Sequence, residues 1–423
     1  MSKLTPIPID YSWAFSDKTI KDTSYITHGY YTYPAKFIPQ LASKLINDYS
    51  EKNDIVIDPF MGSGTTIVES LVNSRVGIGT DINEIAYLLS KVKTTALNTS
   101  ELTAAFDALY DELFLFASNG DAHTEIPIQN MQRIDYWFLP SQKKTLLNIF
   151  SKICLIENAD VKDFFLIAFA QILKSCSIWL QKSVKPTRDH NKKKYEPILL
   201  FFQQAKRMIK KNEEFNKILP NEVKNNIERY RTVEYGDSRK LPCKSETAKL
   251  IVSSPPYVTS YEYADLHQLP LLWFGHLNDL SNYRKKYIGS AYRNRDDIDL
   301  KSATADDIIS KLNKHKKSEE VKNYFADMLE TFMEIRRVLK KGGKACIVIG
   351  NTEFNGVQIL NAEVFQEQFE NIGFRTDKVI HREIPSKMLP STRNILTGQF
   401  TKKHDGDLKL AYPTEYIIVM EKL

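Results

Sequence analysis

The sequence predicts an α/β protein built on a doubly wound, mostly parallel, seven-stranded sheet that a large helical insertion interrupts. Three observations predict this fold class. Strand and helix patterns alternate over residues 54–93, about seven apolar runs have the length of strands, and a block with helical periodicity and few glycines separates two groups of them. We expect three parts: residues 1–99, the helical insertion at 100–231, and residues 232–423.

The elements follow one another in a regular order. The stretch DIVIDPF predicts a first strand, and MGSGTT, a helix, the strand RVGIGTDI and a second helix follow it. After the insertion the pattern resumes at VEYGDSR and AKLIVSSPPY. A helix ending in KKGG, the strand KACIVIGN, a helix at 362–371 and the strand TEYIIVMEKL complete the chain. Between them, a basic loop is expected at about residues 283–317, which are rich in Lys, Arg, Tyr and Asp.

Composition excludes several classes of protein. The formal net charge of +6 agrees with a nucleic-acid partner without deciding for one. The N-terminus has no apolar signal region, and the most apolar stretch, FFLIAFAQIL at 164–173, is too short to span a bilayer and predicts a buried helix. Four scattered cysteines without a CxxC pair argue against a disulfide framework and a zinc site. We therefore expect a cytoplasmic protein that needs neither membrane nor metal.

The first motif with chemical content is DPFMGSGTT, residues 58–66. A Gly-rich turn between a strand and a helix lets the backbone approach a ligand closely. A phosphate-binding P-loop would need a lysine at its end, and a dinucleotide fingerprint a third glycine, and both are missing. The remaining interpretations are a turn without a ligand and the cofactor turn of an S-adenosylmethionine enzyme. In the second, Asp58 pairs with the methionine ammonium, and the turn itself lines the cofactor site, with the residues Gly62, Ser63, Gly64 and Thr65.

Two further aspartates follow predicted strands. Asp81 ends RVGIGTD, where a carboxylate is placed to accept hydrogen bonds from ribose hydroxyls. Asp237 follows the third predicted strand, where it is placed to accept a bond from an adenine amino group. Each alone fits a helix cap or a turn equally well. Three aspartates at the ends of successive strands favour a nucleoside site.

The second motif is Ser254-Pro255-Pro256-Tyr257, directly after the fourth predicted strand. The prolines end the strand and stiffen the loop. An exocyclic amine on a base is a poor nucleophile, because its lone pair is delocalised into the ring. Hydrogen bonds from that amine to the Ser254 side chain and the Pro255 carbonyl would favour a pyramidal nitrogen. Tyr257 would stack on the base, which must leave the duplex to be reached.

The combination of DPFMGSGTT and SPPY resembles the amino-methyltransferases that modify DNA bases. SPPY is the usual form in the group that methylates N4 of cytosine, whereas adenine N6 enzymes more often carry an acidic residue or Asn before PPY. HGYYTYPAKFIPQLASKLI (28–46) resembles the N-terminal helix motif that packs against the methionine end of the cofactor. The likeness covers about residues 25–95 and 232–423, and it implies the Rossmann-like methyltransferase sheet. The insertion lies outside it.

The resemblance implies S-adenosyl-L-methionine as cofactor and double-stranded DNA as partner. It makes Lys36 and Phe37 candidate cofactor contacts and places Phe60 between the two ligands. Such enzymes are commonly half of a restriction–modification system, so a cognate restriction endonuclease acting on the same site is a candidate partner. The alternatives are an adenine N6 enzyme, a methyltransferase acting on RNA or on a protein glutamine, and a non-catalytic DNA-binding subunit.

Basic residues outside the two motifs are candidate phosphate contacts, because the enzyme must grip DNA. The alternative is a set of solvated loops, which charge runs usually form. One group lies in the insertion and one follows the SPPY loop, with the members Lys185, Arg188, Lys192, Lys193, Lys194, Arg284, Lys285, Arg293 and Arg295.

Overall fold

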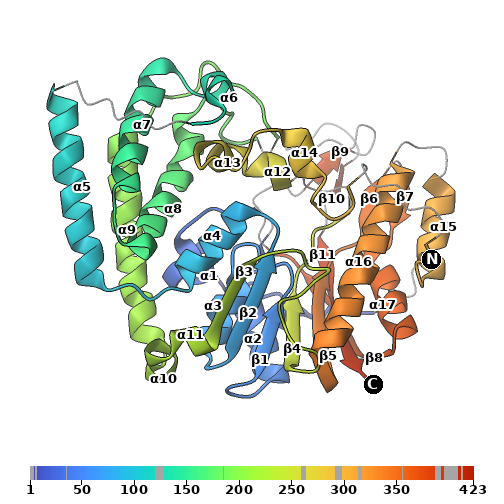
Figure 1. Cartoon of the computed structure of the whole chain (residues 1–423). Helices are drawn as coiled ribbons and strands as arrows, with labels where there is room; N and C mark the ends of the chain where they lie inside the picture. Colours follow the sequence, from blue (N-terminus) through green and yellow to red (C-terminus); the bar gives the residue numbers. More distant parts are fainter. Residues whose placement is uncertain are drawn as a thin grey trace.

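A twisted central sheet with helices on both faces forms the lower half of the molecule, and a helical unit stands above it (Figure 1). This computed structural model describes residues 4, 7–34, 36–119, 128–183, 185–258, 263–290, 298–312, 317–354, 356–385, 392–394, 408–410 and 413–423.

The central sheet has seven strands in the order β3-β2-β1-β4-β5-β11-β8. The first five in that order are parallel, and β11 runs antiparallel to both β5 and β8. The predicted doubly wound, mostly parallel sheet is therefore confirmed. The strands are β1 (Ile55–Asp58), β2 (Val76–Asp81), β3 (Arg231–Tyr235), β4 (Ala248–Ser253), β5 (Leu339–Ile349), β8 (Phe374–Glu383) and β11 (Thr414–Lys422).

Burial on both faces explains the apolar strands at the centre of the sheet. One face carries Ile57, Ile251 and Ile347, which pack under α15, α16 and α17. The other face packs against α2, with Val56 and Leu250 among its residues. The covering helices are α2 (Pro39–Tyr49), α3 (Thr65–Val72), α4 (Glu84–Lys93), α15 (Ala303–Leu312), α16 (Ser318–Val338) and α17 (Asn361–Asn371).

The edge strand β8 was not among the strands that we named from the sequence. Its residues FRTDKVIHRE are largely polar, and burial along the strand is intermittent. An edge strand has one unpaired side and is half solvated, so it needs no continuous apolar run. The short elements near the sheet are η1 (Tyr11–Trp13), α1 (Ile20–Thr23), η2 (Ile26–Gly29), β6 (Thr352–Phe354), β7 (Val357–Ile359), β9 (Thr392–Asn394) and β10 (Leu408–Leu410).

The segment between β2 and β3 folds as helices around a core of its own. Its α8 carries the apolar stretch at 164–173 and is buried along most of its length, as predicted. The helices are α5 (Thr99–Asn119), α6 (Met131–Trp137), α7 (Pro140–Cys154), α8 (Ala159–Cys176), α9 (Pro197–Ile218), α10 (Asn221–Asn225) and α11 (Ile227–Tyr230). None of the helices in the described residues is long and apolar enough to cross a membrane.

The helical core also includes residues that follow the SPPY loop in the sequence. Residues of α12 (Tyr263–Leu266), α13 (Gln268–Trp273) and α14 (Leu280–Arg284) pack into it, with Trp273 lying against Phe138 and Phe169. The helical unit therefore extends past the boundary expected at residue 231. The segment 283–317, which we expected to be a basic loop, contains α15, and this helix buries Ala305, Ile308 and Leu312.

Candidate active site

The Gly-rich turn after β1 has the backbone that only glycine adopts without strain. Gly62 and Gly64 have φ angles of +46° and +71°. A Cβ on Gly64 would lie 2.7 Å from Ser90 Oγ and 3.1 Å from Ser90 Cα, so α4 packs directly on the turn. Ser90 in turn donates a hydrogen bond of 2.9 Å to the Gly62 carbonyl. The turn is therefore rigid and leads straight into the first residue of α3, Thr65.

Asp58 at the end of β1 joins the two sequence motifs. Its carboxylate accepts hydrogen bonds from Ser253 Oγ (2.7 Å), which directly precedes the SPPY loop, and from Thr66 Oγ1 (2.8 Å). The Phe60 amide donates to the same carboxylate at 3.1 Å. Burial raises the pKa of Asp58 to about 6, although these hydrogen bonds lower it. The Gly-rich turn and the strand end that leads into the SPPY loop are thus held together through one buried carboxyl group.

Asp81 ends the neighbouring strand β2, at the same edge of the sheet. It accepts bonds from the Gly62 amide and the Asn83 amide, both at 2.9 Å. Burial also raises the pKa of this carboxyl group to about 6. The structure therefore brings Asp58, Asp81 and the turn together at the carboxyl ends of two parallel strands. This edge is where open α/β sheets bind ligands.

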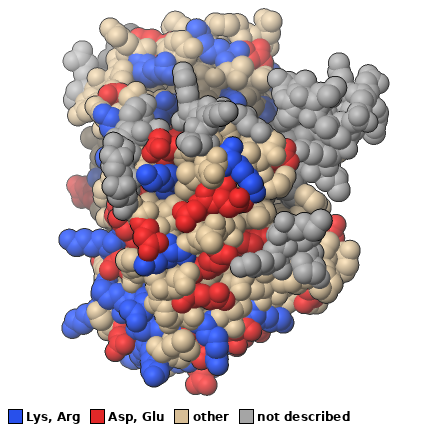
Figure 2. Space-filling model, turned by 90° about the vertical axis from the view of Figure 1, so that its right-hand side faces the viewer, with Lys and Arg blue, Asp and Glu red and all other residues tan. Residues whose placement is uncertain are grey.

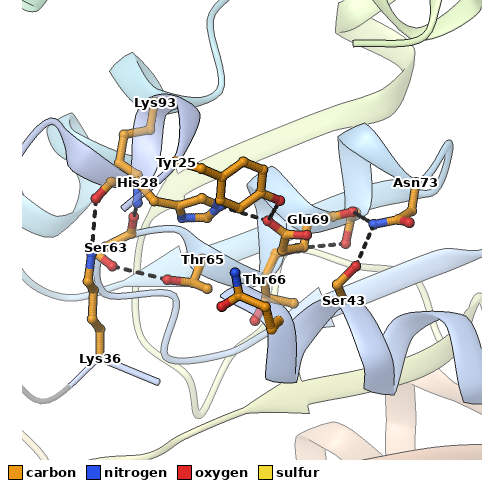
Figure 3. A network of polar contacts seen from close by, with 12 residues as sticks. Tyr25, His28, Lys36, Ser43, Ser63, Thr65, Thr66, Glu69, Asn73 and Lys93 are labelled. Carbon is orange, nitrogen blue, oxygen red and sulfur yellow. Dashed lines mark hydrogen bonds and ion pairs between the residues drawn. The ribbon is translucent and has the colours of Figure 1, made fainter. Parts of the chain in front are cut away.

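Buried charged residues surround the far side of the turn (Figure 3). Lys36 donates to the His28 carbonyl at 3.0 Å, and Lys93 donates to the Ser63 carbonyl. Glu69 accepts bonds from Tyr25 Oη (2.5 Å) and lies 2.8 Å from His28 Nε2. Burial lowers the pKa of Lys36 to about 8 and raises that of Glu69 to about 7. The half-buried Lys36 and the fully buried Lys93 thus lie beside the turn, and burial lowers the pKa of Lys93 well below its usual value.

The side chains of the remaining three candidates, Phe37, Phe60 and Asp237, have other neighbours than the Gly-rich turn. Phe37 is half-buried against the α2 face, and Phe60 is half-buried against the α16 face of the sheet. Asp237 lies two residues beyond β3 and forms an ion pair with Arg239, at 2.5 Å. Arg239 also binds the buried Asp327. Its role as an adenine contact stays a prediction, and the pair with Arg239 is a competing use of its carboxylate.

The SPPY loop lies directly beyond β4. Ser254 is half-buried, and its hydroxyl has no hydrogen-bond partner among the described residues. The Pro256 carbonyl accepts a bond of 2.7 Å from Tyr324 Oη on α16. Tyr257 donates its hydroxyl to Glu415 at 3.0 Å, and its ring lies against Gly350 at the end of β5. The loop is therefore fixed from several strands and a helix, while Ser254 Oγ stays available to a ligand.

Comparisons with known proteins agree with this geometry. A family model described as DNA methylase (N6_N4_Mtase) matches residues 5–91 and 248–423, more than half of the chain. The chain belongs to the DNA methylase family. The match omits the helical insertion and covers the segments that carry both motifs.

Relatives of known activity resemble the chain over most of its length. The Type II methyltransferase M.MvaI of Kocuria varians is 26% identical over 444 residues, which cover 95% of this chain and 92% of that protein. M.BsoBI of Geobacillus stearothermophilus, also a Type II methyltransferase, is 22% identical over 415 residues, or 83% of this chain and 79% of that protein. Membership of the DNA methylase family implies S-adenosylmethionine as the methyl donor and DNA as the partner.

The basic candidates of this DNA methylase separate into two groups. Two of them bind inside the protein: Lys192 donates to the Trp179 carbonyl at 2.7 Å, and Arg284 binds Asp265 at 2.6 Å. Burial lowers the pKa of Lys192 to about 8, as expected for a structural ammonium group. The others that can be placed are exposed at the surface: Lys185, Arg188, Lys193, Lys194 and Lys285. Arg293 and Arg295 lie outside the described residues.

The sequence did not reveal the residues whose side chains pack behind the Gly-rich turn or hold the SPPY loop by hydrogen bonds. Glu69 and His28 come from a helix and a segment whose patterns indicate only burial, and Tyr324 lies in an amphipathic helix. Glu415 is the second residue of the last strand and belongs to no motif. The available signal for Glu69 was the one charged residue in a short helix, TTIVESLV, that is otherwise uncharged, because a buried carboxyl group needs a partner.

Proposed function

We propose that the chain transfers a methyl group from S-adenosylmethionine to N4 of a cytosine that has been flipped out of duplex DNA. The observation that carries the proposal is the hydrogen bond between Ser253 and Asp58. It spans 195 positions of sequence and joins the cofactor turn to the loop that would hold the base. Donor and acceptor would then meet at the carboxyl ends of β1 and β4, which are neighbours in the sheet. Ser254 before PPY supports cytosine.

The residues present fit the cofactor. The ammonium of its methionine part would lie near Asp58, and Asp81 would accept bonds from the ribose hydroxyls. The half-buried ammonium group of Lys36, whose pKa of about 8 keeps it protonated at neutral pH, provides positive charge for the methionine carboxylate. When bound, the cofactor supplies a methyl group activated by positively charged sulfur.

The SPPY loop would prepare the amine and orient it. The amine donates one hydrogen to Ser254 Oγ and the other to the Pro255 carbonyl, which favours a pyramidal nitrogen with a usable lone pair. Tyr257 stacks on the base and fixes its plane. The cofactor would supply the methyl carbon to the nitrogen lone pair, its sulfur would keep the electrons of the broken sulfur–carbon bond, and the amine would release one proton to water. No covalent enzyme intermediate is needed, so positioning supplies much of the rate.

We further propose that the exposed basic candidates of the insertion contact the DNA backbone, namely Lys185, Arg188, Lys193 and Lys194. The guanidinium carbons of Arg133 and Arg188 lie 4.6 and 4.3 Å from the centre of the Tyr136 ring, which holds both groups. Figure 2 shows Lys and Arg near the top of one face, at the height of α6 and α7, and again along its lower left, with Asp and Glu concentrated between them. The two guanidinium groups held on Tyr136 favour the insertion as the part that contacts phosphates.

Salt dependence tests the backbone contact. Arg188→Ala should make the slope of log affinity against log salt shallower by about 1, because each lost phosphate contact removes about one released counterion. Lys210→Ala, which removes an exposed lysine on α9, is the matched control. An unchanged slope for Arg188→Ala would remove this residue from the interface.

Three alternatives remain distinguishable. N6 of adenine is the runner-up, since it presents the same amine chemistry to the same loop. RNA or a protein glutamine would be the acceptor if DNA yields no product. A non-catalytic DNA-binding subunit has no need of the Ser253–Asp58 link or of a Ser254 hydroxyl left open to a ligand. As a Type II-like enzyme, the chain would act at one DNA sequence, with a cognate restriction endonuclease cutting the same sequence.

Two variants test the division of roles. Asp58→Ala should abolish cofactor binding in calorimetry while some nonspecific DNA affinity is retained, and undiminished cofactor affinity would remove Asp58 from the site. Tyr257→Ala should lower the methylation rate far more than cofactor affinity, and near-normal turnover would rule out stacking. Digestion of the methylated DNA and mass spectrometry of the nucleosides identifies the base: N4-methylcytosine supports the proposal, and N6-methyladenine replaces it with the runner-up.

A further inference from the structure

The ring of Tyr257 is held at its hydroxyl end by the C-terminal strands. Its Oη donates to Glu415 Oε2 at 3.0 Å, and Glu415 Oε1 lies 3.3 Å from Arg382 Nη1. Glu415 and Arg382 face each other directly across β11 and β8. The ring also packs closely against the backbone of Gly350, where an added Cβ would lie 3.1 Å from the ring. Three strands therefore determine where this ring lies.

The pair behind the tyrosine is buried. Glu415 is 8% exposed and Arg382 3% exposed, so both are largely removed from water. A buried carboxylate needs a counter-charge, and Arg382 provides it at the position opposite in the ladder. With Oε1 engaged by arginine, the other carboxylate oxygen is directed to the phenol. A hydrogen bond to a charged acceptor is stronger and more directional than one between neutral groups.

A second hydroxyl holds the loop one residue earlier. Tyr324, which is 2% exposed on α16, donates to the Pro256 carbonyl at 2.7 Å. Its ring packs against Phe325 and Phe365, and these contacts fix the position of its hydroxyl group. The loop lacks strand hydrogen bonds at its prolines, which have no N–H. Side-chain hydroxyls and carboxylates take over the role that ladder bonds have in a strand.

We propose that Glu415 and Tyr324 are positioning residues for methyl transfer, with Arg382 orienting Glu415. They fix the plane of the Tyr257 ring and the Pro256 carbonyl, so that the base meets a preformed surface rather than a loop that must first order itself. This inference rests on the proposed stacking role of Tyr257. It also explains why the position carries tyrosine, since phenylalanine would stack equally well without the hydroxyl.

The decisive variant is Tyr257→Phe, which keeps the ring and leaves the ion pair intact. We expect kcat to fall about tenfold, which is the loss of one hydrogen bond to a charged group in the transition state. Cofactor affinity should stay at the wild-type value, and kcat should fall at temperatures well below the melting transition, where the variant is still folded. A purely structural role would lower kcat only as the protein unfolds. Tyr235→Phe removes a similar bond to Glu84 (2.9 Å) away from the loop and is the matched control.

A double-mutant cycle tests the partner. Glu415→Leu alone would leave Arg382 without its counter-charge, so it is combined with Arg382→Met, which removes both the charged pair and the acceptor of the Tyr257 hydroxyl. This double variant should lower kcat as Tyr257→Phe does, and adding Tyr257→Phe to it should cost nothing more. Independent, additive losses would overturn the role of Glu415. Tyr324→Phe should lower kcat by a separate factor of similar size.

Two failures have different meanings. If Tyr257→Ala loses activity and Tyr257→Phe matches the wild-type protein, the positioning inference is wrong and the stacking role stands. If Tyr257→Ala itself is near normal, the proposed function of the loop fails with it.

Discussion

Replacing Gly64 by alanine should damage the cofactor site through one well-defined contact. Alanine at the φ of +71° of Gly64 costs about 1–2 kcal/mol, because a Cβ is strained in the left-handed region. The new Cβ would lie 2.7 Å from Ser90 Oγ and 3.1 Å from Ser90 Cα. Rotation of the Ser90 hydroxyl would not relieve this overlap, because the Cα of Ser90 is also too close. Shifting α4 costs about 1–3 kcal/mol, as overpacking does.

The whole change should lower the free energy of unfolding by about 2–5 kcal/mol, the sum of these two costs. It should also weaken cofactor binding at least tenfold, because Ser90 donates to the Gly62 carbonyl within the same turn. Urea unfolding measures the first quantity, and calorimetric titration with S-adenosylmethionine the second.

Gly342→Ala is the control. Its φ of +72° is nearly the same, and nothing lies within 4 Å of the added Cβ. It should cost only the strain of about 1–2 kcal/mol and leave cofactor affinity unchanged. Equal losses of stability for the two variants, with unchanged cofactor binding in both, would refute the close packing of α4 on the turn.

Three further predictions concern charge and the catalytic loop. Because burial raises the pKa of Asp58 and Asp81 to about 6, cofactor affinity should fall as the pH drops through 6. As the pH falls from 6 to 4, these two carboxyl groups take up protons in the folded state before they do in the unfolded state. They should therefore increase the free energy of unfolding of the ligand-free protein over this range. If urea titrations showed that Asp58 and Asp81 instead lower the free energy of unfolding over this range, their raised pKa values would be contradicted. Burial lowers the pKa of Lys36 to about 8, so affinity should also weaken above pH 8, and Lys36→Met should abolish this alkaline limb in calorimetry. Ser254→Ala should lower the methylation rate about tenfold or more at unchanged cofactor affinity, and a normal rate would exclude its hydroxyl from the reaction.

The parts of the fold that the sequence predicts are those where local pattern and final environment agree. The central strands β1, β4 and β5 are buried on both faces, so their apolar runs mark them. The turn at 58–66 needs glycine backbone, which is equally visible in the sequence. The edge strand β8 is half solvated and gave no such signal. The packing of α12–α14 into the helical unit is a tertiary choice that no local pattern reveals.

The candidate site divides in the same way. Asp58, Asp81 and the SPPY loop lie next to strand ends, so topology alone brings them to one edge of the sheet. The contacts of Lys192 and Arg284 could not be predicted. A sequence does not show whether a basic residue faces solvent or, as these two do, binds a carbonyl or a carboxylate of the same protein. Glu415 and Tyr324 reach the loop from distant segments, and only the assembled structure shows their contacts.

Transfer of a labelled methyl group by the purified protein tests the central claim most directly. The chain would be incubated with unmethylated genomic DNA and S-adenosylmethionine carrying a trideuterated methyl group, and the DNA would be digested to nucleosides for mass spectrometry. The account predicts trideuterated N4-methylcytosine, reduced strongly in Tyr257→Ala and absent in Asp58→Ala. Label in N6-methyladenine would contradict the assignment of cytosine, and bound cofactor without label in any DNA base would contradict the account of the site as a DNA amino-methyltransferase centre.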